Sequence, residues 1–265
     1  MSHSSIPPLG FELGELISAA ALRIRKARRT VALTGAGLSV ESGIPPFHPG
    51  LSGAVGLWGR YDPMEYATID AFVRDPARVW EMLREVGLTL MAARPNAGHL
   101  ALAGLESAGM LACTITQNVD GLHREAGSLR LIELHGNWRT MTCQTCRASI
   151  ASAGVPLARL PPLCACGGVL KPDVTLFGEI IPARLIDAAY EEARTCDCMI
   201  VVGTSASVYP AASIPQMARD DGAFLIEVNT REEPRGGSLA DVWLEGPASV
   251  ILPQLAREIG IGREN

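Results

Sequence analysis

The sequence predicts an α/β fold built on a parallel sheet with helices on both faces, into which a smaller module is inserted. Apolar strand candidates alternate with helical stretches along most of the chain, which is typical of βαβ units. A glycine turn follows the first strand candidate, where sheets of this kind hold phosphate groups. Two regions, 43–94 and 139–172, interrupt the alternation. Together these observations predict a Rossmann-like domain carrying an insertion.

The elements of this domain follow in a regular order. Segment 11–29 has apolar residues at helical spacing and arginines in its last turn, where they complement the helix dipole, so it is the first helix candidate. The apolar run 30–34 is the first strand candidate. Further strands are expected at 111–116, 129–134, 199–203 and 223–228, and further helices at 95–108, 182–195, 210–220 and 247–259.

The two interruptions predict the inserted module. Region 43–94 has an entry rich in proline and glycine followed by helical periodicity, and region 139–172 is short and contains cysteines. We expect these regions to form one small module, part helical and part metal-binding ribbon. The Rossmann-like domain then consists of 1–42, 95–138 and 173–265. No internal repeat or low-complexity tract was found.

Composition limits the class of protein. With 265 residues, 48% of them hydrophobic, the chain can bury a sizeable core. A formal net charge of −5 argues against a broad electrostatic grip on nucleic acid. The sequence contains no apolar run of membrane-spanning length, so we expect a cytoplasmic protein without membrane association. We also expect a monomer. Lys26 and Lys171 are the only lysines, which a composition bias towards arginine explains without any functional role.

Four of the seven cysteines have the spacing of a structural zinc site. Cys143 and Cys146 form a C-x-x-C pair, and Cys164 and Cys166 form a C-x-C pair after 17 intervening residues. In an extended segment, residues i and i+2 point the same way, so both thiolates of the second pair can reach one metal. Four thiolates leave no open position for water, which predicts a structural ion. The remaining cysteines are expected to be buried thiols: Cys113, Cys196 and Cys198.

The residues around the glycine turn make it a more specific signal than the turn alone. Gly35-Ala36-Gly37 alone is weak evidence, because such turns are common and Val40 breaks the full G-x-G-x-x-G pattern. The longer string TGAGLSVESGIP at 34–45, however, resembles the nucleotide-binding signature of the sirtuin family. Further blocks recur in that family's order: TQNVDGLH at 116–123, ELHG at 133–136, KPDVTLFGE at 171–179, GTSASVYPA at 203–211, EVN at 227–229 and GPAS at 246–249. The resemblance runs from about residue 31 to residue 253.

This resemblance implies an NAD-dependent protein lysine deacylase with NAD and Zn²⁺ as cofactors and acylated-lysine proteins or peptides as partners. Its products would be nicotinamide, O-acyl-ADP-ribose and free lysine. His135 would be the general base on the ribose hydroxyls, a role that suits an imidazole with an unperturbed pKa of about 6.5. Asn118 would orient the ribose and a water, Asp120 would bind the nicotinamide amide, and Gln117 would approach the ribose. Without the resemblance, this polar string is an ordinary turn.

The resemblance also implies the residues that bind the cofactor, and one of them departs from the family pattern. His48 stands where the family commonly has arginine, and its shorter, mostly neutral side chain weakens charge-assisted contacts. Phe47 is kept and can cover the nicotinamide site. The implied set is Gly35, Ala36, Gly37, Ser39, Glu41, Phe47, His48, Gln117, Asn118, Asp120, Gly203, Thr204, Ser205, Asn229 and Ala248.

Segments 174–179 and 207–210 resemble the two that hold a substrate strand in the family. Members that remove succinyl or malonyl groups carry a Tyr-x-x-Arg pair before the block that begins at Pro95, and here Leu83 and Val86 fall at those positions. Neither can bind a carboxylate, so neutral acyl groups should be preferred. A slip of one position would bring Arg84 to the channel instead. The implied substrate residues are Leu83, Val86, Val174, Leu176, Phe177, Gly178, Glu179, Val208 and Tyr209.

Two other functions stay open at this point. The same activation of NAD can serve ADP-ribosyl transfer or NAD hydrolysis, and a module that senses NAD or ADP-ribose without turnover belongs to another class. His48 favours the sensing module. The complete set of His135, Asn118 and Asp120, with the substrate segments, favours deacylation.

Overall fold

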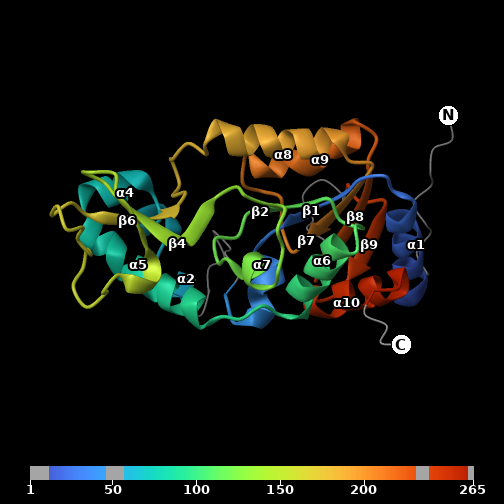
Figure 1. Cartoon of the computed structure of the whole chain (residues 1–265), viewed down its shortest axis with the longest axis horizontal. Helices are drawn as coiled ribbons and strands as arrows, with labels where there is room; N and C mark the ends of the chain where they lie inside the picture. The colour runs from blue at the N-terminus through green and yellow to red at the C-terminus, as the bar shows by residue number, and fades with distance from the viewer. Residues whose placement is uncertain (1–11, 46–56, 231–238, 262–265) are drawn as a thin grey trace.

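The structure is a computed structural model that describes residues 12–45, 57–230 and 239–261 (Figure 1). A large layered part, with a sheet between two sets of helices, lies at one end of the long axis. A smaller part, with its own short sheet and helices, lies at the other end (Figure 1). The predicted α/β class, a Rossmann-like sheet with a small inserted module, is confirmed.

The larger sheet has six parallel strands in the order β3-β2-β1-β7-β8-β9. All five residues of β1 are buried, as are all five of β7, and these two strands pair at the centre with Thr30 opposite Cys198. The chain order therefore reverses beside β1, which is where open α/β sheets bind ligands. The strand bounds are Thr30–Thr34 (β1), Cys113–Thr116 (β2), Leu131–Glu133 (β3), Cys198–Val202 (β7), Phe224–Asn229 (β8) and Val242–Glu245 (β9).

Helices cover both faces of this sheet (Figure 1). On one face, the apolar stripe of α1 (Leu13–Lys26) packs with α6 (Ala97–Ser107) and α10 (Ala248–Ile259). On the other face, α8 (Ala183–Thr195) and α9 (Ile214–Asp220) cover the sheet. Two separate apolar clusters result, one on each side of the strands.

The smaller sheet is antiparallel, with the order β5-β4-β6. Its strands are β4 (Gly136–Cys143), β5 (Ser149–Ala151) and β6 (Leu170–Val174), and the helices of this part are α2 (Leu57–Arg60), α3 (Pro63–Tyr66), α4 (Ile69–Arg74) and α5 (Pro76–Ala92). A third apolar cluster joins α5 to this sheet. Within it, Trp80 Nε1 donates to the carbonyl oxygen of Leu170 over 2.9 Å, and the Trp80 and Trp138 rings meet edge to face.

Several elements differ from their predicted ranges. Strand β1 matches its prediction, and the other predicted strands are shifted or shortened by one or two residues at an end. The sequence analysis did not predict β9, β4, β5 or β6. Short connecting elements complete the chain: the 3-10 turns at Ala36–Ser42, Ser152–Gly154 and Ala211–Ser213, and helix α7 (Leu122–Glu125). Of the helices within the described ranges, none is long and apolar enough to cross a membrane.

Candidate functional site

A cavity of about 1740 Å³ is lined both by the loops after β1, β2 and β7 and by α5, β4 and β6 of the smaller part. All predicted cofactor, catalytic and substrate residues within the described ranges lie on its wall. Phe47 and His48 fall outside those ranges. The predicted residues on the wall are Gly35, Ala36, Gly37, Ser39, Glu41, Leu83, Val86, Gln117, Asn118, Asp120, His135, Val174, Leu176, Phe177, Gly178, Glu179, Gly203, Thr204, Ser205, Val208, Tyr209, Asn229 and Ala248.

Glycines form the floor of the cavity where β1 and β7 end. The N–H of Gly37 donates to the carbonyl oxygen of Gly203 over 2.8 Å, and the N–H of Gly35 donates to that of Val202. A Cβ on Gly37 would lie 2.6 Å from the Cα of Gly203, and Gly203 has a φ of +56°. Side chains are thus excluded here, and the resulting cradle suits the close approach of a pyrophosphate to the backbone. This feature fits NAD.

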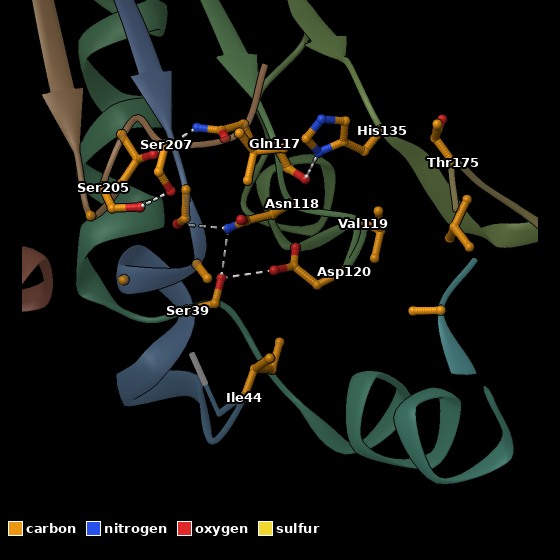
Figure 2. A pocket seen from close by; sticks show the side chains of 18 of the residues that line it. Ser39, Ile44, Gln117, Asn118, Val119, Asp120, His135, Thr175, Ser205 and Ser207 are labelled. Carbon is orange, nitrogen blue, oxygen red and sulfur yellow. Dashed lines mark hydrogen bonds between the residues drawn. The ribbon is translucent and has the colours of Figure 1, made fainter. Parts of the chain in front are cut away.

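A chain of polar side chains crosses the cavity wall (Figure 2). Asn118 Nδ2 donates to the carbonyl oxygen of Gly35 over 3.0 Å and to Ser39 Oγ over 3.1 Å. Ser39 Oγ in turn donates to Asp120 Oδ2 over 2.7 Å. Burial raises the pKa of the Asp120 carboxyl, although the N–H of Leu122 and the hydroxyl of Ser39 oppose that shift. These bonds hold the amide and the carboxyl in fixed orientations.

His135 follows β3 and precedes β4, and one hydrogen bond sets its protonation pattern. Its Nδ1 lies 2.9 Å from the carbonyl oxygen of Gln117 (Figure 2). A carbonyl only accepts, so Nδ1 carries the proton and the lone pair of the neutral ring is on Nε2. Burial lowers the pKa of His135, and the Gln117 carbonyl partly offsets this. The ring is therefore neutral near pH 7 and can accept a proton at Nε2.

The turn after His135 leaves no room for a side chain. Gly136 has a φ of +75°, and a Cβ there would lie 1.9 Å from the carbonyl oxygen of Asp173. β4 can thus begin directly after His135 and pair with the end of β6, where Gly136 lies opposite Val174. His135 therefore lies at the junction of the larger and the smaller sheet.

Two further histidines lie behind the cavity wall, and the sequence analysis gave neither a role. His99 Nε2 is 3.5 Å from Ser39 Oγ, and His123 Nε2 is 2.9 Å from Thr34 Oγ1. Their rings pack edge to face with centroids 5.2 Å apart. Burial lowers the pKa of His99 to about 4 and that of His123 to about 3. Both rings are neutral under ordinary conditions.

One wall of the cavity is apolar and comes from α5. Leu83 is only 3% exposed, and Val86 lies one turn further along the same helix. Both line the cavity, and Arg84 between them does not. Met82, Leu90 and Trp138 extend the same wall. No cationic side chain among the described lining residues is available to pair with a carboxylate.

Several lining residues were missed by the sequence analysis. Ile44 and Val119 line the cavity beside the polar chain, and Thr175 lies near His135 (Figure 2). Ile180 and Tyr190 line it beyond the substrate segment. Ile44, Val119 and Thr175 lie inside the sequence blocks quoted above, but an apolar or hydroxyl side chain carries no chemical signature of its own. Their closeness to the motif residues was the only available signal.

The four predicted metal ligands come together in the smaller part. The Sγ atoms of Cys143, Cys146, Cys164 and Cys166 all lie within 4.8 Å of one another. The Cys143–Cys166 and Cys146–Cys164 pairs are 3.5 and 3.7 Å apart. Tetrahedral zinc with Zn–S bonds of about 2.3 Å requires S···S separations of about 3.8 Å, so the cluster fits this ion. The other three cysteines are confirmed as buried thiols, and burial raises the pKa of each to about 12: Cys113, Cys196 and Cys198.

Comparison with known sequences gives one consistent family. A sequence model described as the Sir2 family matches residues 35–210. NAD-dependent protein deacylase 2 of Pyrobaculum aerophilum is 46% identical over 239 residues, which are 89% of this chain and 93% of that protein. NAD-dependent protein deacylase of Aeropyrum pernix is 46% identical over 239 residues, covering 90% of this chain and 95% of that protein.

Solved structures agree with these relatives. A complex of a Sir2 homolog with NAD has a TM-score of 0.82 and 41% identity, and the match covers 91% of this chain and 92% of that one. A complex of Sir2 with a p53 peptide and NAD⁺ has a TM-score of 0.81 and 31% identity, with 94% of this chain and 99% of that one covered. The chain therefore belongs to the Sir2 family of NAD-dependent protein deacylases.

Proposed function

We propose that this chain removes acyl groups from lysine side chains of proteins or peptides, consuming NAD and releasing nicotinamide, O-acyl-ADP-ribose and free lysine. The observation that carries the proposal is the position of His135 Nε2, a neutral base in the same cavity as the Asn118–Ser39–Asp120 chain and an apolar wall. This combination provides a proton acceptor, polar groups for a nucleotide and an apolar surface for an acyl chain.

The cofactor would lie across the glycine floor. NAD supplies a ribose carbon from which nicotinamide can be expelled by the acyl oxygen of the substrate. Gly35, Gly37 and the adjoining Ala36 would hold the pyrophosphate through their backbone, and Asn118 and Asp120 would orient the nicotinamide half. Residues of the other turns are suited to the adenosine half: Gly203, Thr204, Ser205, Asn229 and Ala248. Glu41 and Gln117 complete the wall. Phe47 would cover the nicotinamide site, and His48 would make weaker charge-assisted contacts with the cofactor than an arginine.

His135 would act as general base at Nε2, taking a proton from a ribose hydroxyl. The Nδ1–H bond to Gln117 keeps the other nitrogen protonated, so the ring cannot present the wrong tautomer. Gln117 is held in turn, because its Nε2 donates to Thr204 Oγ1 over 2.8 Å. The base is thereby oriented before the substrate arrives.

The acylated lysine would enter beside the segments 174–179 and 207–210. Val174, Leu176, Phe177, Gly178 and Glu179 would line one side of the peptide, and Val208 and Tyr209 the other. The similar Sir2 chain solved with a p53 peptide and NAD⁺ supports peptide binding. Leu83 and Val86 would contact the acyl chain.

The zinc held by Cys143, Cys146, Cys164 and Cys166 would stabilise the smaller module. We place that module at 43–94 and 139–172, with the Rossmann-like domain at 1–42, 95–138 and 173–265. The net charge of −5 supports a protein that does not bind nucleic acid directly. The chain would act as a monomer in the cytoplasm.

The test is nicotinamide release measured with and without an acetyl-lysine peptide, alongside mass spectrometry of the products. Deacylation predicts release that depends on the peptide, with free lysine and O-acetyl-ADP-ribose formed in equal amounts. Release without peptide would point to NAD hydrolysis or ADP-ribosyl transfer. No release, with NAD still bound, would point to a sensing module.

A further inference from the structure

Lys171 in β6 is buried, with its side chain 8% exposed, and its ammonium lies among three oxygens. Nζ donates to the carbonyl oxygens of Val174 over 2.7 Å and Pro172 over 3.3 Å, and it lies 2.9 Å from Glu179 Oε2. An ammonium has three N–H donors and no acceptor. The ammonium therefore donates hydrogen bonds to two backbone oxygens and forms an ion pair with the carboxylate of Glu179.

The choice of lysine is unusual in this chain. Only Lys26 and Lys171 are lysines, and Lys26 is exposed at the end of α1. Every other ion pair among the described residues uses arginine. A guanidinium is planar and spreads its donors over a fork, whereas an ammonium presents three from one atom. Lys171 is therefore an exception to the chain's preference for arginine, at a position where the surrounding oxygens suit an ammonium.

Two of the three oxygens around the Lys171 ammonium belong to the two ends of one segment. Val174 begins the segment and Glu179 ends it, so a single ammonium joins both ends. Glu179 Oε2 also accepts from the N–H of Leu176 over 2.7 Å. Between these points the chain turns at Gly178, which has a φ of +84°. The Lys171–Glu179 pair therefore closes residues 174–179 into a loop of fixed shape.

We propose that Lys171 and Glu179 are positioning residues that set the shape of segment 174–179 for binding the substrate backbone. This inference rests on the proposed function, in which that segment lies beside the peptide. Desolvation of the buried Lys171 ammonium offsets much of its attraction to Glu179, whose side chain is 26% exposed, so the pair contributes little to net stability. Its directional bonds nevertheless fix where backbone groups point, and a peptide bound through main-chain hydrogen bonds depends on that. Lys171 itself does not line the cavity.

The test compares Lys171→Arg, which keeps the charge and loses the geometry, with the parent enzyme. We expect the KM for an acetyl-lysine peptide to rise about tenfold or more, while kcat and the KM for NAD change by less than about twofold. The variant Lys171→Met removes the ammonium from a residue outside the cavity wall and should show the same selective rise. NAD binding is measured separately by calorimetry without peptide. If Lys171→Arg does not fold, Lys171→Met replaces it, since its side chain is unbranched and apolar and cannot pair with Glu179.

A matched control is Glu192→Gln. Glu192 is 17% exposed and pairs with Arg29 on the larger sheet, and it does not line the cavity. This variant should lower the melting temperature and leave the peptide KM unchanged. A folded Lys171→Arg enzyme with the parental peptide KM, or with equal rises in both KM values, would overturn the inference. A parent enzyme that releases no nicotinamide with peptide would instead refute the proposed function.

Discussion

The backbone N–H of Thr175 donates to the carbonyl oxygen of His135 over 2.8 Å. Thr175 belongs to the segment proposed to hold the peptide, and His135 is the proposed base. Their separation is thus set by a main-chain hydrogen bond and is independent of either side chain. The next residues, Gly136 and Val174, continue the contact as partners in β4 and β6. The proposed base and the proposed peptide segment are therefore joined directly through their backbones.

Removing the base should separate binding from turnover. His135→Ala deletes the ring without adding a buried charge, so the protein should fold and bind NAD as the parent does. Deacylation should fall by about 100-fold to 10,000-fold, the usual contribution of a general base. The measurement is kcat/KM for an acetyl-lysine peptide, with NAD affinity by calorimetry as control. Near-parental turnover would refute the assignment.

The pH dependence of activity should follow the shift at His135. Burial lowers the pKa of this ring, with the Gln117 carbonyl acting in the opposite direction. A base must be neutral, and a lowered pKa keeps it neutral to lower pH. The acidic limb of kcat/KM should therefore have its midpoint below the ordinary histidine value of 6.5. A midpoint above 6.5 that disappears in His135→Ala would contradict this expectation.

Stability should also depend on pH, through the paired buried histidines His99 and His123. The folded-state pKa is about 4 for His99 and about 3 for His123, below the ordinary value of 6.5. As pH falls below 6.5, the unfolded chain takes up protons first, so the free energy of unfolding decreases. Each ring contributes a slope of up to about 1.4 kcal/mol per pH unit in this window. The raised pKa of Asp120 acts in the opposite sense at the acidic end.

The check is chemical denaturation of the parent and of His123→Gln at about pH 7 and about pH 5. His123→Gln should be less stable at neutral pH, because the packing of the ring is lost, but its stability should change less between the two conditions. An equal pH dependence in the two proteins would show that His123 does not titrate as described.

Loss of zinc should unfold the smaller part. Cys143→Ser or Cys166→Ser removes one of four thiolates, and metal-binding free energy is also folding free energy. Elemental analysis should find about one zinc per chain in the parent and little in either variant, with a lower melting temperature. Cys113→Ala is the control, because Cys113 is buried in the larger part and should leave the zinc content unchanged. A stable parent without metal would refute the site.

The acyl group should be selected by the wall at Leu83 and Val86. A succinyl carboxylate placed there would have no partner, which costs several kcal/mol, or a few orders of magnitude in rate. We expect kcat/KM to be much higher for an acetylated peptide than for its succinylated form. The double variant Leu83→Tyr, Val86→Arg should narrow this gap by supplying a partner. Comparable values for both peptides in the parent would contradict the role of these residues.

The sequence predicted the elements whose residues carry a strong local pattern. Strand β1 is an unbroken buried run bounded by Arg29 and Gly35, and its range was predicted without error. Strand β9 was not predicted, and only Val242 and Leu244 of its four residues are buried. Pairing of β4 with β6 joins residues distant in sequence, and no local pattern encodes such contacts. The proposed domain boundaries at 138/139 and 172/173 lie within these two paired strands.

The candidate site shows the same difference between residues with a local sequence signal and residues whose role depends on tertiary packing. Residues with distinctive chemistry, such as His135 and the paired cysteines, were named from the sequence. The burial of Lys171 and the edge-to-face contact of His99 with His123 were not, because both result from tertiary packing. The scarcity of lysine was visible in the composition, yet it gained significance only when the three oxygens around Nζ were known.

The contact between Gly37 and Gly203 has a mechanical consequence. The two turns meet with no side chain between them, and each would collide with a methyl group placed on the other. Separation of β1 and β7 at this end would break the hydrogen bond from the N–H of Gly37 to the carbonyl oxygen of Gly203. At this point the floor of the cavity consists of two closely packed backbone turns. In Gly203→Ala, the added methyl group would lie 2.5 Å from the backbone nitrogen of Leu38 and 2.7 Å from the Cα of Gly37, so both turns would have to shift.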